Sequence, residues 1–154
     1  MLLLTETEET QATQPTQPKP RSKIMIVDDD PAICLALTVR LRVNHYKTVS
    51  ARDGYSALAL AQEERPNLIL LDLGLPREDG FAVLKLLQQV PALVEIPVII
   101  LSGQNPQAHA KRALESGAVA FFQKPADNKE LFGMIRDCLQ FGSGGRFRPM
   151  RQDE

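Results

Sequence analysis

Three short apolar runs lack polar alternation, and each of them ends on a polar residue. They span residues 23–28, 67–72 and 96–102 and are rich in Ile, Val and Leu. Strands that are buried on both faces of a parallel sheet have this pattern, because both sides of each strand are covered. Residues 46–51 and 118–123 are weaker candidates for two further strands. The pattern therefore predicts a mostly buried parallel sheet.

Longer segments with helical spacing of apolar residues separate these runs. In each of them apolar positions recur about every three or four residues: Ile33, Leu37 and Leu41; Ala57 and Ala61; Phe81, Leu84 and Leu87; Ala110, Ala113 and Leu114; Leu131, Ile135 and Leu139. This spacing places the apolar side chains on one face of a helix. Five strands that alternate with five helices predict an α/β fold, with right-handed crossovers and helices on both faces of a five-stranded parallel sheet.

Capping and turn-forming residues lie between the expected elements. The pair Asp30–Pro31 is typical of a helix N-terminus, where Asp caps the helix and Pro takes the first helical position. Asp53–Gly54 and Asp79–Gly80 indicate turns. Gly117 lies where a helix end needs left-handed backbone, which glycine adopts without strain. These signals agree with five strand–helix repeats.

Polar segments flank this pattern at both ends. Residues 5–22 are rich in Thr, Gln, Pro and Glu, so residues 1–22 are expected to form a disordered leader, and residues 142–154 a flexible tail. The folded domain is therefore expected at residues 23–141, the size of one domain. The chain starts without the basic residues of a signal peptide, and no apolar stretch reaches membrane-spanning length. A cytoplasmic location without membrane binding is the expectation.

The overall charge and the remaining reactive residues suggest no further site. The net charge is -1, and the three arginines of the tail lie beside two acidic residues, so no direct nucleic-acid binding is expected. Cys34 and Cys138 are far apart and lack metal-ligand spacing, which favours two small buried apolar residues. His45 and His109 lie in no motif that supports phosphate transfer, so we expect two solvent-exposed histidines.

Side chains suited to phosphate chemistry follow four of the five expected strands. Asp28 and Asp29 end the first strand, Asp72 the third and Ser102 the fourth, and Lys124 follows the fifth. Parallel strands end at one edge of a sheet, and ligands bind there. Three close carboxylates repel one another unless a cation joins them, and oxygen ligands suit Mg²⁺. The sequence thus predicts a magnesium site at this edge.

The same group of residues predicts a chemical step. A carboxylate can act as a nucleophile and form an aspartyl phosphate, a role that suits Asp72. The Lys124 ammonium can hold a phosphate oxygen as a point charge, and the Ser102 hydroxyl can donate to another. Taken singly, each residue has an ordinary structural explanation, such as a helix cap or a surface turn. Together they predict phosphoryl transfer to Asp72.

The sequence resembles the receiver domain of response regulators in two-component signalling systems. Four segments carry the resemblance in order: IMIVDDD at 24–30, LDLGLP at 71–76 with Asp79–Gly80, VIILSG at 98–103 and GAVAFFQKP at 117–125. Their spacing is similar to that of the family, and the resemblance covers essentially all of residues 23–141. It implies a flavodoxin-like (βα)5 fold with strand order 2-1-3-4-5.

The resemblance also implies a role for each residue of the site. Asp72 corresponds to the phosphoacceptor, and Lys124 to the lysine that pairs with the phosphoryl group. Asp28, Asp29 and Asp72, with the backbone carbonyl of Gly74, correspond to the ligands of Mg²⁺.

Two further residues resemble the switch of the family. Ser102 corresponds to the hydroxyl that moves toward the phosphoryl group, and Phe121 to the aromatic side chain that swings between outward and inward positions. Phe121 is also consistent with plain core packing. Gly74 and Gln104 match positions that influence the lifetime of the phosphoryl group, and the bond before Pro125 is usually cis in the family.

The implied function is a phosphorylation-dependent switch that assists its own phosphorylation and dephosphorylation and is not an ordinary enzyme. A sensor histidine kinase or a histidine phosphotransfer protein would supply the phosphoryl group. No DNA-binding or catalytic output domain is expected after residue 141, so the expected output is a protein partner or a homodimer through the fourth helix, fifth strand and fifth helix, or relay of the phosphoryl group onward. A constitutive adaptor that does not use phosphorylation is the alternative. A phosphatase is disfavoured, because Gly74 stands where such enzymes place a second acid.

Overall fold

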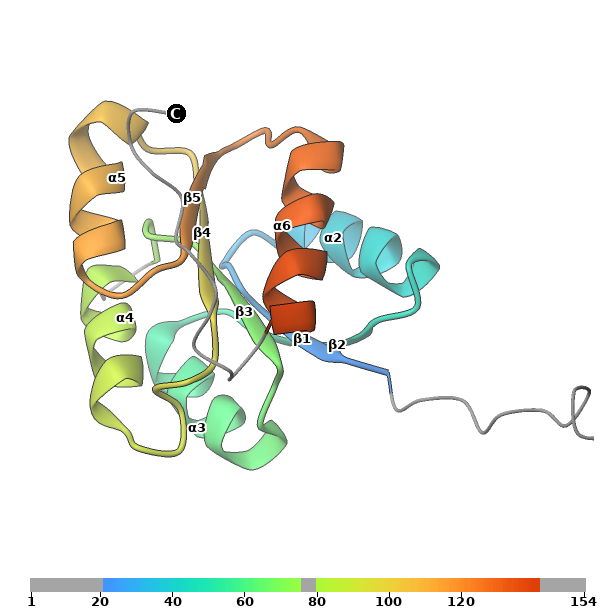
Figure 1. Cartoon of the computed structure of the whole chain (residues 1–154), viewed down its shortest axis with the longest axis horizontal. Helices are drawn as coiled ribbons and strands as arrows, with labels where there is room; N and C mark the ends of the chain where they lie inside the picture. The colour runs from blue at the N-terminus through green and yellow to red at the C-terminus, as the bar shows by residue number, and fades with distance from the viewer. Residues whose placement is uncertain (1–20, 76–79, 142–154) are drawn as a thin grey trace, which may run out of the picture.

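The computed structural model describes residues 21–75 and 80–141, and five parallel strands alternate there with five helices (Figure 1). The elements are β1 (Lys23–Val27), α2 (Pro31–Val43), β2 (Lys47–Ala51), α3 (Gly54–Glu64), β3 (Leu68–Leu71), α4 (Gly80–Gln89), β4 (Val98–Ser102), α5 (Pro106–Glu115), β5 (Ala120–Gln123) and α6 (Asn128–Phe141). The strand order is β2-β1-β3-β4-β5, which confirms the expected order. The tail at 142–154 and all but the last two residues of the leader lie outside the described residues.

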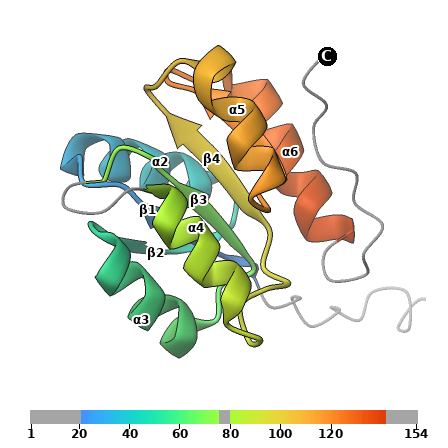
Figure 2. The same cartoon turned by 90° about the vertical axis from the view of Figure 1, so that its left-hand side faces the viewer.

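Helices cover both faces of the sheet. One core cluster joins the sheet to α3, α4 and α5, and these three helices face the viewer in Figure 2. A second cluster joins the opposite face to α2 and α6. Met25 and Val27 belong to the first cluster, whereas Ile24 and Ile26 belong to the second. Because successive side chains of a strand point to opposite faces, a run apolar on both faces is what this two-sided burial requires.

The backbone register brings the ends of the strands together at the carboxyl edge of the sheet. Val27 pairs with Leu71, and the Asp72 amide donates to the Val27 carbonyl at 2.9 Å. On the other side, Ser102 pairs with Gln123, and the Lys124 amide donates to the Ser102 carbonyl at 2.8 Å. Polar residues that are far apart in the sequence therefore lie at one edge.

Most helix caps and turns lie where the sequence predicts them. Asp30 caps α2 by accepting from the Ala32 amide at 2.9 Å, with Pro31 as the first helical residue. Gly117 has φ 110°, the left-handed backbone expected there. Asp53–Gly54 was expected to form a turn, but Asp53 caps α3 and Gly54 begins that helix. An Asp side chain satisfies free amides in a cap as well as in a turn, so the sequence signal is the same.

Candidate functional site

An acidic cluster lies at the carboxyl edge of the sheet. One carboxylate oxygen from each of Asp28, Asp29 and Asp72 lies within 4.8 Å of the other two. Asp28 and Asp72 are buried, at 3% and 8% exposure, whereas Asp29 is exposed. Burying a carboxylate is costly unless it is paired and hydrogen-bonded. The cluster therefore requires partners, and the structure supplies them.

Lys124 is the partner that joins the two buried carboxylates. Its Nζ lies 2.6 Å from Asp28 Oδ2 and 3.3 Å from Asp72 Oδ2. Burial alone would lower the pKa of Lys124, but the hydrogen bond to Asp28 and the charges of both carboxylates outweigh it and raise that pKa. Lys124 therefore stays an ammonium. The peptide bond between Lys124 and Pro125 is cis, as the resemblance implied.

Backbone amides hold the second oxygen of each buried carboxylate. Asp28 Oδ1 accepts from the Asp30 amide, and Asp72 Oδ1 accepts from the Gly74 amide, both at 3.0 Å. Each carboxylate is thus fixed by a backbone amide through one oxygen and by Lys124 through the other. Such double anchoring orients the carboxylates before any ligand arrives.

The donor set of this cluster fits a divalent cation. With the three carboxylates ionised, their charge of -3 and the +1 of Lys124 leave a charge of -2 (-3 + 1 = -2). Hard oxygen ligands of this kind suit Mg²⁺, which is bound in proteins through a few carboxylates and retains water ligands. The residues present therefore match the expected cofactor in both charge and ligand type.

The two expected switch residues, Ser102 and Phe121, lie on the last two strands, β4 and β5. Ser102 is fully buried at the end of β4, and its Oγ accepts from the Gln104 amide at 3.2 Å. Phe121 pairs with Ile100 across the β4–β5 ladder and is buried in the core cluster that faces α3, α4 and α5. The structure thus holds the aromatic ring inside the protein.

Two glycines near the site differ in how much space surrounds them. A Cβ on Gly80, the first residue of α4, would overlap Leu73 Cα and lie 2.8 Å from the Asp72 carbonyl oxygen. A Cβ on Gly103 would find no heavy atom within 4 Å. Gly80 was expected only as part of a turn, and its close approach to the backbone of the site was missed. Only contacts across the fold show it, because the sequence signal of a turn glycine is the same.

The two cysteines differ in environment. Cys138 is buried as expected, and burial raises the pKa of its thiol to about 12. Cys34 is half-buried, and its Sγ donates to the Asp28 carbonyl oxygen at 3.3 Å. Burial, and then the negative charge of Asp28, raise the pKa of the Cys34 thiol. A thiol with a raised pKa is a poor nucleophile at neutral pH.

The histidines also differ from each other. His45 is exposed as expected, with φ 69°. His109 was expected to be exposed but is half-buried, with its ring centroid 6.0 Å from that of Phe81. The guanidinium of Arg112 lies over the same ring at 3.9 Å. Packing of α5 against the start of α4 explains the burial, since the helical pattern alone did not specify which helix α5 contacts.

Residues 24–136 match the family model of the response regulator receiver domain. Among curated relatives, the response regulator PleD of Caulobacter vibrioides is 36% identical over 78% of this chain and 26% of its own length. The DNA-binding dual master transcriptional regulator RpaA of Synechocystis sp. is 36% identical over 77% of this chain and 49% of its own length. The chain thus spans about half or less of these relatives.

Solved structures give the same result. A putative response regulator from Chloroflexus aurantiacus superposes with a TM-score of 0.75 and 27% identity, over 79% of this chain and 99% of that one. The chemotaxis response regulator CheY4 of Vibrio cholerae has a TM-score of 0.71 and 25% identity, over 77% and 98%. Five strands in the order 2-1-3-4-5, an acidic cluster at their carboxyl edge and the family match together show that this chain belongs to the response regulator receiver domains of two-component systems.

Proposed function

We propose that this chain is a phosphorylation-dependent signalling switch in which Asp72 accepts a phosphoryl group. Receiver domains are signalling domains that generally bind Mg²⁺ in an acidic pocket. The observation that carries the proposal is the position of Lys124, whose ammonium contacts both Asp28 and Asp72, two buried carboxylates that each also accept from a backbone amide. A purely structural site of this kind would gain nothing from an excess charge of -2.

The proposed step is a transfer from a phosphohistidine of a sensor histidine kinase or a histidine phosphotransfer protein. A carboxylate oxygen of Asp72 attacks phosphorus; the new O–P bond forms as the P–N bond breaks, and the electron pair goes to the histidine nitrogen. Lys124, already held beside Asp72, neutralises charge on the incoming oxygens. Mg²⁺ held by Asp28, Asp29, Asp72 and the Gly74 carbonyl would supply further charge neutralisation.

The proposed response to phosphorylation begins at Ser102 and Phe121. The Ser102 hydroxyl turns toward the new phosphoryl oxygens, and Phe121 repacks in the core it shares with α4 and α5. The surface of α5, β5 and α6 then changes its affinity for a downstream protein or a second copy of the chain. This is a two-state element that a local change of charge shifts.

Native mass spectrometry of the full chain with Mg²⁺ and acetyl phosphate tests this function. We expect one phosphoryl group on the wild type and none on Asp72→Asn. Asp30→Asn is the matched control, because Asn caps a helix as well as Asp does and Asp30 lies outside the acidic cluster. Replacing Mg²⁺ with EDTA should reduce the phosphoryl occupancy at least tenfold.

Two outcomes would contradict the proposal. Equal phosphoryl occupancy in the wild type and Asp72→Asn would place the modification elsewhere. No occupancy with either acetyl phosphate or a phosphorylated histidine phosphotransfer protein would favour a constitutive adaptor that does not use phosphorylation. The same spectra report whether phosphorylation produces a dimer or leaves a monomer that acts on another protein.

A further inference from the structure

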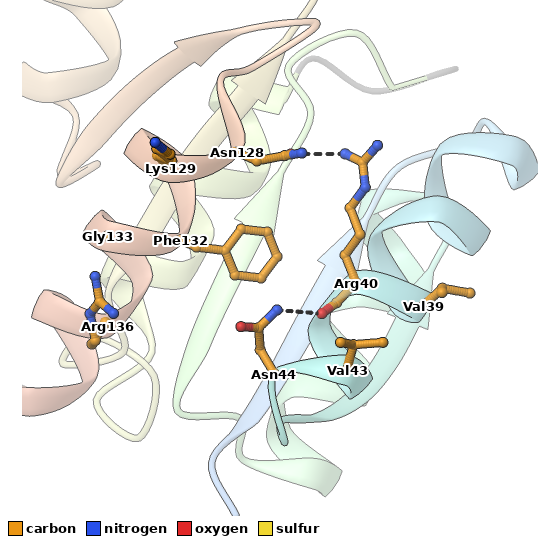
Figure 3. Close-up of a pocket in the computed structure, with 9 residues that line it drawn as sticks. All are labelled: Val39, Arg40, Val43, Asn44, Asn128, Lys129, Phe132, Gly133 and Arg136. Atoms are coloured by element: carbon orange, nitrogen blue, oxygen red, sulfur yellow. Dashed lines mark hydrogen bonds between the residues drawn. The ribbon is translucent and has the colours of Figure 1, made fainter.

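A groove of about 580 Å³ lies between α2 and α6, on the face of the sheet opposite α3, α4 and α5 (Figure 3). Its walls are formed by Val39, Arg40, Val43, Asn44, Asn128, Lys129, Phe132, Gly133 and Arg136. Figure 3 shows the Phe132 ring pointing from α6 toward α2, and the Arg40 side chain reaching across to Asn128. We call this surface the α2–α6 groove.

The apolar wall of the groove is exposed to solvent. Val39 is 53% exposed and Val43 71%, and Leu35, one turn before Val39, is 65% exposed. These three residues are four positions apart and form an apolar stripe along α2. A different series on the same helix, Leu37 and Leu41, is buried in the core. The stripe is therefore apolar surface in addition to what the fold needs.

The groove is also positively charged. It is lined by Arg40, Lys129 and Arg136 and by no acidic residue, since the acidic residues of α6 lie outside the lining. Arg40 Nη1 donates to Asn128 Oδ1 at 2.9 Å, which leaves its charge uncompensated. Within residues 21–75 and 80–141, no carboxylate forms an ion pair with any of these three cations. A fitting occupant carries apolar side chains together with carboxylates.

The first nine residues of the chain, MLLLTETEE, have this chemistry. Three leucines are followed by three glutamates within nine positions. We propose that residues 1–9 of this chain dock in the α2–α6 groove, with their leucines on its apolar residues and their glutamates beside its cations. The other end of the chain does not fit, because residues 142–154 contain three arginines that the groove would repel.

The connection to the domain allows this docking within one chain. The Lys47 amide donates to the Ser22 carbonyl at 2.9 Å, and Lys47 follows Asn44 of the groove by three positions. Ser22 therefore lies beside Lys47, and at most about 10 Å of extended backbone separates Lys47 from Asn44 in the groove. Residues 10–21 can span about 40 Å when extended, which is enough to bring residues 1–9 to the groove. Short tethers give effective concentrations of about 1 mM, so a free-segment Kd of about 100 μM would leave the groove about 90% occupied.

Docking of residues 1–9 would cover a surface that continues toward the phosphorylation site. Arg40 and Asn128 also line a neighbouring cavity of about 380 Å³, whose other lining residues include Lys124 of the site and Pro125. A protein that approaches the site across α2 and α6 would have to displace the segment. The N-terminal residues thus act as an internal competitor, an inference that goes beyond the proposed phosphorylation switch and does not depend on it.

Nitrogen–proton correlation NMR of the full chain tests the proposal. The triple variant Glu6→Lys, Glu8→Lys, Glu9→Lys is compared with the wild type at low salt. We expect amide shifts centred on Val39, Val43 and Phe132, and wild-type signals that move toward the variant positions in 0.5 M NaCl, because salt screens exposed charges. The variant Lys129→Glu reverses a charge of the groove itself and should shift the same groove amides.

Two matched controls and two contrary results complete the test. Gln11→Lys, Gln14→Lys, Gln17→Lys adds positive charge just outside the docking segment, and Lys85→Glu reverses a charge on α4, across the sheet; neither should shift the groove amides. Unchanged groove signals in the triple variant would overturn the proposal. Shifts that depend on protein concentration would also overturn it, because they would identify a second copy as the occupant.

Discussion

The carboxyl edge of the sheet and the α2–α6 groove depart from ordinary residue placement in opposite ways. At the edge, Asp28, Asp72 and Ser102 are polar and buried, and each has hydrogen-bond partners inside the protein. In the groove, Val39 and Val43 are apolar and exposed. Both departures are more informative than an apolar core or a polar surface. The first gathers fixed carboxylates that fit a divalent cation, and the second leaves apolar side chains open to solvent.

Replacing one glycine at the carboxyl edge and one in the α2–α6 groove gives the largest expected difference in stability. Gly80→Ala should destabilise the protein by about 3 kcal/mol, because the new Cβ meets the backbone of Leu73 and Asp72. Gly133→Ala, on the groove, should stabilise it by about 0.5 kcal/mol through helix propensity, since its Cβ has only the tip of Arg136 nearby. Urea denaturation measures both. Equal effects would mean that α4 moves away from the site at little cost.

Removal of a cation should cost more at the site than in the groove. Lys124→Met leaves two buried carboxylates without their shared partner and should lower the free energy of unfolding by about 2 kcal/mol in the absence of divalent cations. Arg40→Met loses one exposed hydrogen bond and should cost about 0.5 kcal/mol or less. Thermal melts in EDTA compare the two. Equal losses would show that the buried pairing is not stabilising.

Alkaline pH should reduce the difference in stability between the wild type and Lys124→Met. The pKa of Lys124 is raised above 10.5 in the folded protein, so the folded state binds this proton more tightly than the unfolded state. Its contribution is therefore complete below pH 10.5 and is lost as the pH rises through the raised pKa. We expect the stability difference between wild type and Lys124→Met to be constant from pH 7 to 9 and to shrink above 10.5. A stability difference that grows with pH would contradict the raised pKa of Lys124 in the folded protein.

The smallest effect is expected on the apolar wall of the groove. In the triple lysine variant of residues 1–9, Val39→Ser and Val43→Ser should each change the free energy of unfolding by less than about 0.5 kcal/mol, because both side chains are exposed once the segment no longer docks. Leu41→Ala, on the buried side of the same helix, should cost about 3 kcal/mol. A larger loss in the wild type than in the triple lysine variant would come from the docked residues 1–9. A loss above 1 kcal/mol that persists in the triple lysine variant would show that the two valines stabilise the fold itself.

Much of the fold followed from the sequence because burial on both faces of a strand leaves a pattern of its own. The runs that end at Asp28, Asp72 and Ser102 are strands in the structure, and the sheet order is the expected one. The site residues could be grouped before the structure because parallel strands share one edge. The sequence did not reveal the apolar stripe on α2, because the Leu37 series and the Val39 series are equally apolar.

By itself, the sequence determined the α/β class, the position of each strand and the identity of the polar residues at the strand ends, because these depend on local periodicity and chain direction. Only the tertiary structure decided that Lys124 contacts both Asp28 and Asp72, that a side chain on Gly80 would meet backbone, and that Val39 and Val43 are exposed beside α6. These features depend on distances between elements far apart in the chain. Helical spacing indicates which residues share a face, but only the packing of α6 beside α2 shows which face is left exposed.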